Sequence, residues 1–296
     1  MESSNLGSVP EETLEEQHQQ DSSKPVFSAF ASRPDRPPTQ SSSQKYSPLD
    51  WAAYFDREED VCISDSNDVF HLYMAGKEGP VVFCLHGGGY SGLSFALSAG
   101  KIKEKARVVA MDLRGHGKSS TENDLDLSIE GTAMASLIHM QKILSNRMQH
   151  FSSIEKAIEW SVRGGSLRNI DSARVSIPTT LSYDDSKQCY VYRARLEETE
   201  QYWRGWYEGL SEKFLSCPVP KVLLLAGTDR LDSRALTIGQ MQGKFQMVVV
   251  RHTGHAIQED VPDEFATLIL NFISRNRIGP HGVEIPGLGW RAQPRS

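Results

Sequence analysis

The stretch Val81-Val82-Phe83-Cys84-Leu85-His86-Gly87-Gly88-Gly89 decides the fold class. It opens with a short, continuous apolar run, which is typical of a parallel strand buried on both faces of a sheet. Glycines follow it directly, and the pattern predicts a helix from Ser94 to Lys105. A second apolar run, Arg107 to Met111, ends at Asp112. Strand, helix and strand make a βαβ unit, so we expect an α/β fold with a mostly parallel sheet.

Further elements on both sides of this unit fit the same fold. Val61 to Met74 predicts a strand or hairpin with its turn at Ser64 to Asp68. Buried strands are predicted at Lys221 to Gly227 and Phe245 to Val250, and Pro262 to Ile273 predicts the closing helix.

Between the two groups of strands the pattern is helical. Apolar residues recur at three- and four-residue spacing in Met134 to Met148 and Ile154 to Val162, and Val191 to Phe214 is predicted as an amphipathic helix. No strand is predicted from Thr121 to Ile170.

The domain prediction follows from these patterns. Residues 1–45 are rich in Ser, Gln, Glu and Pro and are predicted to be a disordered tail. Residues 46–278 are expected to form a single domain with a helical insert at about 131–215, and 279–296 a loose, Pro/Gly-rich tail.

Composition excludes several classes of protein. A formal net charge of −6 over 296 residues provides no basic surplus for nucleic acid. No stretch is long enough to span a bilayer, and the first residues lack the apolar core of a secretory signal. The 4 cysteines form no CxxC pair, so we expect reduced thiols, no metal site and a cytoplasmic or nuclear protein.

The glycine loop has three interpretations. Gly87, Gly89 and Gly92 satisfy GxGxxG, and Asp112 ends the next strand, as in a Rossmann dinucleotide-binding fingerprint. A tight turn without a ligand is the second interpretation. In the third, Gly87 to Gly89 form an oxyanion loop, whose backbone N–H stabilises the negative oxygen of a tetrahedral intermediate.

A late pair of residues favours the oxyanion loop. Asp229 follows the strand at Lys221 to Gly227, and His255 follows the last strand after Gly254. α/β-hydrolases carry their acid and their histidine on such loops, in the order serine, acid, histidine. The Rossmann interpretation does not predict this pair.

With these motifs the chain resembles the protein phosphatase methylesterase family of α/β-hydrolases, from about Pro48 to Arg277. The segments that carry the resemblance are the HGGG loop, Met111 to Gly117, Ala157 to Val162, Ser172 to Ser176, Tyr202 to Trp206, Leu236 to Met247, and Gly254-His255.

The resemblance implies an activity and a partner. It implies a serine esterase without a cofactor that removes the methyl ester from the C-terminal leucine of the protein phosphatase 2A catalytic subunit. It makes His255 the general base. Asp229 stands where many other α/β-hydrolases keep their acid, but in this family structure or substrate contact is an equally open role for it.

The nucleophile is missing. No GxSxG elbow occurs; Ser91 has the wrong glycine spacing and Ser119 follows the wrong strand. Glu130 runs straight into Gly131, where the family should have the elbow strand, its helix and the strand of the triad acid. We therefore expect a shortened form that lacks central strands, folds poorly and is inactive or weakly active. A phosphatase-binding pseudoenzyme is the alternative, with Trp203, Trp206 and Gly239 to Met247 as docking surface, although both Trp residues fit core packing equally well.

Overall fold

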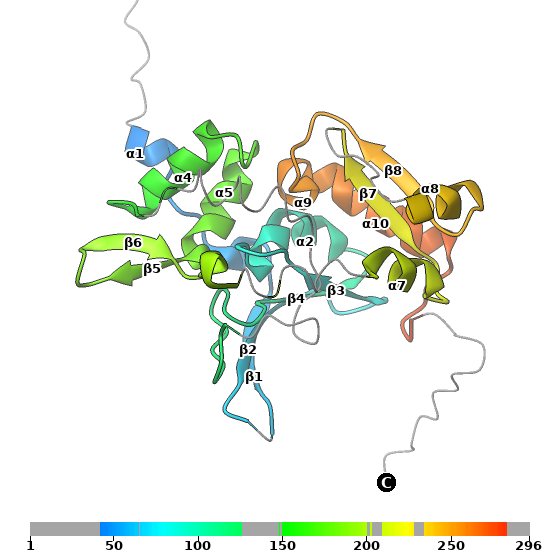
Figure 1. Ribbon diagram of the computed structural model, residues 1–296, viewed down its shortest axis with the longest axis horizontal. Helices are drawn as coiled ribbons and strands as arrows, with labels where there is room; N and C mark the ends of the chain where they lie inside the picture. Colours follow the sequence, from blue (N-terminus) through cyan, green and yellow to red (C-terminus); the bar gives the residue numbers. More distant parts are fainter. Residues whose placement is uncertain are drawn as a thin grey trace, which may run out of the picture. The chain divides into compact units, whose positions relative to one another are not determined.

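A four-stranded sheet forms around the βαβ unit. The computed structural model describes residues 42–64, 66–125, 148, 150–199, 202, 209–227 and 234–282. The strand order is β1-β2-β4-β3 (Figure 1). β3 and β4 are parallel, whereas β2 runs antiparallel to both of its neighbours, β1 and β4. The bounds are β1 Arg57–Cys62, β2 Val69–Ala75, β3 Val81–Leu85 and β4 Arg107–Met111. The predicted hairpin and both strands of the βαβ unit are thus found.

Two helical segments cover one face of this sheet. The crossover from β3 to β4 contains η2 (Gly92–Phe95) and α2 (Ala96–Ile102), and α2 packs against the closing helix α10 (Pro262–Arg275). The core between them and the sheet is made of alternate residues of β2 and β4, such as Tyr73 and Val108. Because successive side chains of a strand point to opposite faces, every second side chain of β2 and β4 lies in the core.

The region before the last strands is not purely helical. Val191 and Tyr192, predicted as helix, belong to a strand that pairs antiparallel with its predecessor, because Cys189 to Tyr192 form a hairpin with Leu181 to Asp184. The elements are α4 (Ile154–Arg163), α5 (Ile170–Ser176), η3 (Ile177–Thr180), β5 (Leu181–Asp184), β6 (Cys189–Tyr192), η4 (Leu196–Thr199) and α7 (Leu210–Ser216). The predicted helix at Met134 to Met148 and the junction Glu130/Gly131 lie outside the described residues, apart from Met148 itself.

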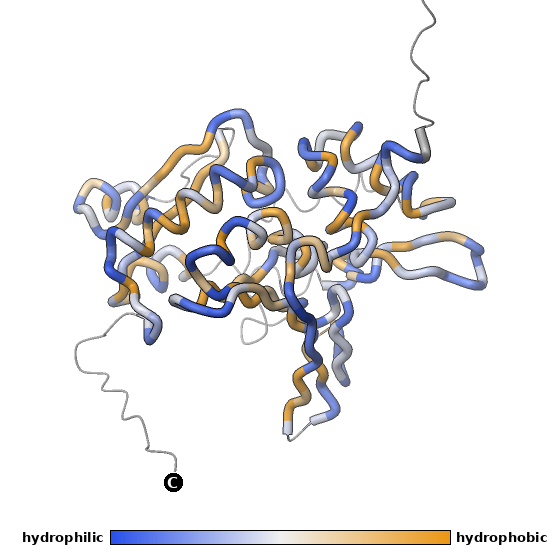
Figure 2. The backbone as a smooth tube through the Cα atoms, turned by 180° about the vertical axis from the view of Figure 1, so that it is seen from behind, coloured by the Kyte–Doolittle hydropathy of each residue, from blue (hydrophilic) through white to orange (hydrophobic). Residues whose placement is uncertain are grey.

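The late strands pair with each other. β7 (Val222–Ala226) and β8 (Gln246–Val250) are parallel, strongly apolar in Figure 2, and packed against α10. Between them lies α8 (Arg234–Met241), and α9 (Ile257–Asp260) precedes α10.

The described residues begin close to the predicted amino-terminal boundary of the domain. Helix α1 (Ser42–Lys45) and the turn η1 (Trp51–Ala53) precede β1. Tyr46 is buried, and Arg174 of α5 donates through Nε to the carbonyl of Ser47 at 2.6 Å. These contacts attach this segment to the domain.

The parallel strands fall into two separate sheets. β3 pairs only with β4, and β7 pairs only with β8, among the residues that the structure describes. The prediction that Val81 to Leu85 is buried on both faces is therefore wrong. Val81, Phe83 and Leu85 are 49%, 53% and 53% exposed, because no described strand or helix covers their side of β3.

Candidate functional site

The candidate site lies where β3 and β4 end. The parallel register pairs Leu85 with Met111, so His86 and Asp112 follow side by side at the carboxyl edge of the sheet. Ligands of open α/β sheets bind at this edge.

His86 is a structural brace. It is 3% exposed, and its Nε2 accepts the Leu113 N–H at 3.0 Å, so its Nδ1 carries the proton and donates to the Gly87 carbonyl at 2.8 Å. Burial, helped by the nearby His116, lowers the pKa of His86 to about 3. A neutral imidazole with both nitrogens engaged joins the two strand ends and has no proton-transfer role.

One backbone amide of the glycine loop is already used in a hydrogen bond to a neighbouring loop. The Gly89 N–H donates to Nε2 of His116 at 2.9 Å, and Nδ1 of His116 lies 2.8 Å from the Arg114 carbonyl. Of the three glycines predicted to serve the oxyanion, Gly89 therefore has its N–H turned to His116. Within the described residues, no backbone hydrogen bond is donated by the N–H groups of Gly87 and Gly88.

A residue of the insert lies over this loop. A Cβ added to Gly88 would meet Cδ2 of Leu196 at 3.5 Å, and Leu196 is buried in η4. The apolar Leu196 side chain thus packs against Gly88.

The Asp112 carboxylate accepts backbone hydrogen bonds and is not accessible to a ligand. It is fully buried, and its two carboxylate oxygens accept the N–H groups of Gly92 at 2.7 Å and Lys118 at 2.8 Å. Burial raises its pKa. A Rossmann protein needs this carboxylate for a ribose hydroxyl, so the geometry speaks against the dinucleotide interpretation.

Neither nearby serine is presented as a nucleophile. Ser91 is fully buried and shares a 2.8 Å hydrogen bond with the Thr179 hydroxyl. Ser119 is also buried, donates to the Asp112 carbonyl at 2.6 Å and accepts the His71 N–H. Both hydroxyls hold loops together.

His255 lies on the loop that follows β8, and its side chain is exposed. Asp260 holds this loop: one carboxylate oxygen accepts the Gly254 N–H at 2.6 Å and the other accepts the Arg168 N–H at 2.7 Å. Asp229, the candidate acid, lies outside the described residues, as do Trp203 and Trp206.

Sequence reasoning missed Glu259, four residues after His255. It is fully buried in α9, accepts the Ser176 hydroxyl at 2.7 Å through Oε2, and burial raises its pKa to about 8. Its Oε1 has no hydrogen-bond partner in the described part of the chain. No local sequence pattern marks Glu259, because residues two apart, such as Ile257 and Glu259, do not share a helix face.

The raised pKa predicts a pH dependence of stability. Because the folded state holds the Glu259 proton up to about pH 8 while the unfolded chain releases it near 4.5, stability falls as pH rises between these values. His86 acts oppositely, since its lowered pKa adds stability as pH rises from about 3, but that gain is complete above 6.5. From pH 6.5 to 8 the free energy of unfolding should therefore fall by up to about 2 kcal/mol.

Glu259→Gln should remove this fall. Urea denaturation at pH 6.5 and pH 8 measures it, with the exposed Glu264→Gln on α10 as the matched control. Equal pH slopes for wild type and Glu259→Gln would show that the buried carboxyl does not titrate in this range.

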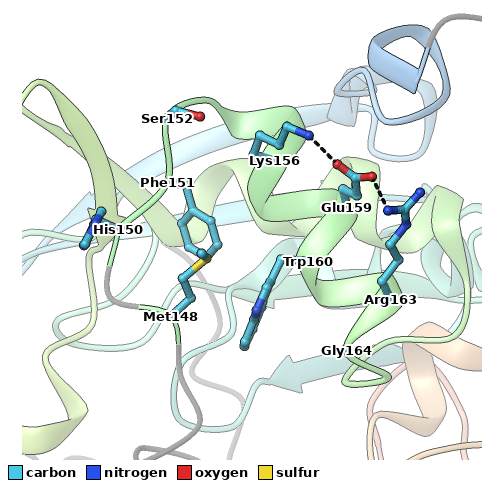
Figure 3. A pocket seen from close by; sticks show the side chains of 9 residues that line it. All are labelled: Met148, His150, Phe151, Ser152, Lys156, Glu159, Trp160, Arg163 and Gly164. Carbon is cyan, nitrogen blue, oxygen red and sulfur yellow. Dashed lines mark hydrogen bonds and ion pairs between the residues drawn. The ribbon is translucent and has the colours of Figure 1, made fainter.

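A cavity of about 570 Å³ lies elsewhere, at the insert (Figure 3). Its lining includes Phe151 and Trp160, and Glu159 pairs there with Lys156 at 2.8 Å and Arg163 at 2.9 Å. The hydrogen bond from Lys156, with the charge of Arg163, lowers the pKa of Glu159. No residue of the glycine loop or the His255 loop lines this cavity, so it is separate from the candidate site.

The part of the chain that the structure describes shows neither a candidate metal site nor a candidate membrane span. It contains no cluster of His, Cys, Asp or Glu side chains suited to a metal ion. None of its helices combines the length and apolar character needed to span a membrane.

The βαβ unit with its HGGG loop, together with a histidine loop after the last strand, defines the α/β-hydrolase class. The Alpha/beta hydrolase family model matches residues 143–268. The bovine protein phosphatase methylesterase 1 is 36% identical, covering 78% of this chain and 87% of the relative. The probable protein phosphatase methylesterase 1 of Caenorhabditis elegans is 40% identical, covering 83% of each. The chain belongs to the protein phosphatase methylesterase family.

The relatives contain stretches that this chain lacks. Their alignments extend over 332 and 305 residues, longer than the 296 residues of the whole chain.

Solved structures support the fold. The chain is similar to E-2-(acetamidomethylene)succinate hydrolase, with a TM-score of 0.60 at 17% identity, over 74% of this chain and 99% of that one. It is also similar to a thioesterase domain from the curacin biosynthetic pathway, with a TM-score of 0.56 at 18% identity, over 73% and 99%.

Proposed function

We propose that this chain is a protein phosphatase methylesterase that has lost its ester-hydrolysing activity or retains only a trace of it. The open side of β3 is the observation that carries this proposal. A serine elbow strand belongs beside the strand that ends at His86, and the structure describes no strand there. Ser91 and Ser119, the serines nearest in sequence to the strand ends, are buried and hydrogen-bonded.

The residues of the proposed site that this chain retains support substrate binding better than ester hydrolysis. His255 is proposed as the general base and Asp229 as its partner, but without a serine the imidazole can at best activate water. The hole is also incomplete, because one oxyanion donor in this class is the N–H after the nucleophile. Gly87 and Gly88 supply the other side.

The proposed partner is the C-terminal tail of the protein phosphatase 2A catalytic subunit. A binding role without turnover is the second candidate, and α8 favours it. Ile238 is 43% exposed and Met241 is 78% exposed, both within the family-specific stretch Leu236 to Met247. Exposed apolar side chains of this kind mark protein contact surfaces. No cofactor, nucleic acid or membrane takes part in this proposal.

A pull-down combined with a demethylation assay tests both candidates. The purified chain is incubated with methylated phosphatase catalytic subunit, and bound protein and remaining methyl ester are measured together. We expect capture without demethylation. Met241→Lys should weaken capture about tenfold or more, whereas Met148→Lys, at another exposed methionine away from α8, should not. Absence of capture would exclude the binding role, and demethylation would exclude the loss of activity.

We also propose that the protein resides in the cytoplasm or nucleus. All four cysteines are described and none forms a disulfide, which is compatible with a reducing compartment. Fluorescence microscopy of the tagged chain tests this, and a secretory-pathway signal would contradict it.

A further inference from the structure

The cavity at the insert is lined along one face of helix α4. Lys156, Glu159, Trp160 and Arg163 recur at three- and four-residue spacing, so they form a single stripe on this helix. Ile158 on the opposite face is fully buried, which fixes the helix against the rest of the domain. The cavity volume of about 570 Å³ is typical of a small-molecule site.

Phe151 and Trp160 form an aromatic floor in this cavity (Figure 3). Their rings meet edge to face, with centroids 6.0 Å apart. Tyr192 contacts the Phe151 ring in the same way at 5.6 Å, and the backbone of Phe151 exchanges two hydrogen bonds of 2.8 Å with Tyr190 of β6. Because Phe151 is held from several sides, the aromatic floor is preorganised for the ring of a ligand.

Two cations line the same cavity and share one carboxylate. Glu159 pairs with Lys156 at 2.8 Å and with Arg163 at 2.9 Å (Figure 3). The Lys156 and Arg163 side chains are 62% and 70% exposed, and each group has more N–H donors than its contact with Glu159 uses. The three side chains together carry one net positive charge in a chain whose net charge is −6. The charge of this cavity is therefore complementary to an anion.

We propose that this cavity binds a small aromatic carboxylate. The ring of the ligand packs on the aromatic floor, and its carboxylate accepts hydrogen bonds from Arg163 and Lys156. A guanidinium can bind a carboxylate through two parallel N–H groups, which favours this anion over a neutral amide. Lys156 and Arg163 repel a cationic ligand. The cavity is separate from the glycine loop and the His255 loop, so the proposal does not depend on the esterase site.

A titration of the full chain with indole-3-acetate, followed by ligand-observed NMR, tests the proposal. The expected dissociation constant is below about 1 mM, which is within reach of a ligand with so few atoms. Indole-3-acetamide has the same ring without the charge and should bind at least about fivefold more weakly. Tryptamine, which carries an ammonium group instead, should bind more weakly still.

Substitutions in the cavity separate recognition of the charge from recognition of the ring. Arg163→Gln should weaken indole-3-acetate by at least about fivefold and change indole-3-acetamide by less than about twofold, because only the charged contact is lost. Trp160→Leu keeps an apolar side chain but removes a ring of the aromatic floor, so it should weaken both ligands.

Arg195→Gln is the matched control for Arg163→Gln. Arg195 is 55% exposed and pairs with Glu198 at 3.3 Å, but it does not line the cavity, so its replacement should change neither affinity. Circular dichroism melts of all variants establish that each one is folded. No binding of indole-3-acetate to the wild type at about 5 mM, equal affinities for the three ligands, or equal effects of Arg163→Gln and Arg195→Gln would each overturn the proposal.

Discussion

The purified chain should hydrolyse a methyl ester about 10⁶-fold more slowly than the bovine methylesterase under the same conditions. Loss of a serine nucleophile elsewhere costs a factor of this size, because histidine and acid act only through the serine. The rate that remains comes from binding and from the oxyanion hole. In the proposed site, Gly87 and Gly88 are the remaining candidate donors, since the Gly89 N–H donates to His116.

The measurement is methanol release from a methyl-esterified phosphatase peptide. His255→Ala should leave the residual rate within about twofold, because removing a triad member after the nucleophile has gone adds little. A variant of the exposed His252 on the same loop serves as the matched control. A wild-type rate that falls about 100-fold or more on His255→Ala would show that His255 still acts in a working site and that another group supplies the nucleophile.

Asp112→Ala should reduce the free energy of unfolding by about 2–6 kcal/mol. The change leaves two backbone N–H groups, those of Gly92 and Lys118, without their acceptor, and each orphaned donor costs about 1–3 kcal/mol. Net stability of a domain is about 5–15 kcal/mol, and we expect the missing strands to place this chain at the low end of that range. The variant should therefore be partly or wholly unfolded at 25 °C.

Urea denaturation followed by circular dichroism measures this effect. The control is Asp263→Ala at the start of α10, where the carboxylate is 84% exposed and pairs with Lys101 at 3.2 Å. A surface ion pair of this kind contributes about 0–1 kcal/mol. A loss for Asp112→Ala no larger than that of Asp263→Ala would show that the strand ends do not depend on the buried carboxylate. A sharp, cooperative melt of high midpoint for the wild type would contradict the expectation of a poorly folding chain.

Much of the fold was predictable because its signals are local. The apolar runs at Val81 and Arg107 are short and continuous, and the glycines after Leu85 end the strand. Both strands of the βαβ unit and the closing helix α10 occur where they were predicted. The end of the hairpin β5–β6 was missed because Val191 and Tyr192 are also compatible with an amphipathic helix, and cross-strand pairing decided between the two.

The candidate site was predictable only in part. The order of the HGGG loop and His255 indicated the class of enzyme, and the lack of GxSxG indicated the missing nucleophile. Asp260 and Glu259 were not predicted, because their roles come from Gly254, Arg168 and Ser176. Arg168 and Ser176 lie more than 80 residues earlier in the chain.

The sequence alone determined the α/β class, the family and the absence of the serine elbow, since each depends on residue type and order along the chain. Only the tertiary structure decided that His86 is a neutral brace, that Gly89 donates to His116 and that Asp112 serves two amides. It also decided that β3, which the sequence predicts to be buried on both faces, has no strand on its outer side among the described residues. The physical reason is that burial and hydrogen bonding depend on neighbours in space, and an apolar run predicts a need for neighbours without showing that they are there.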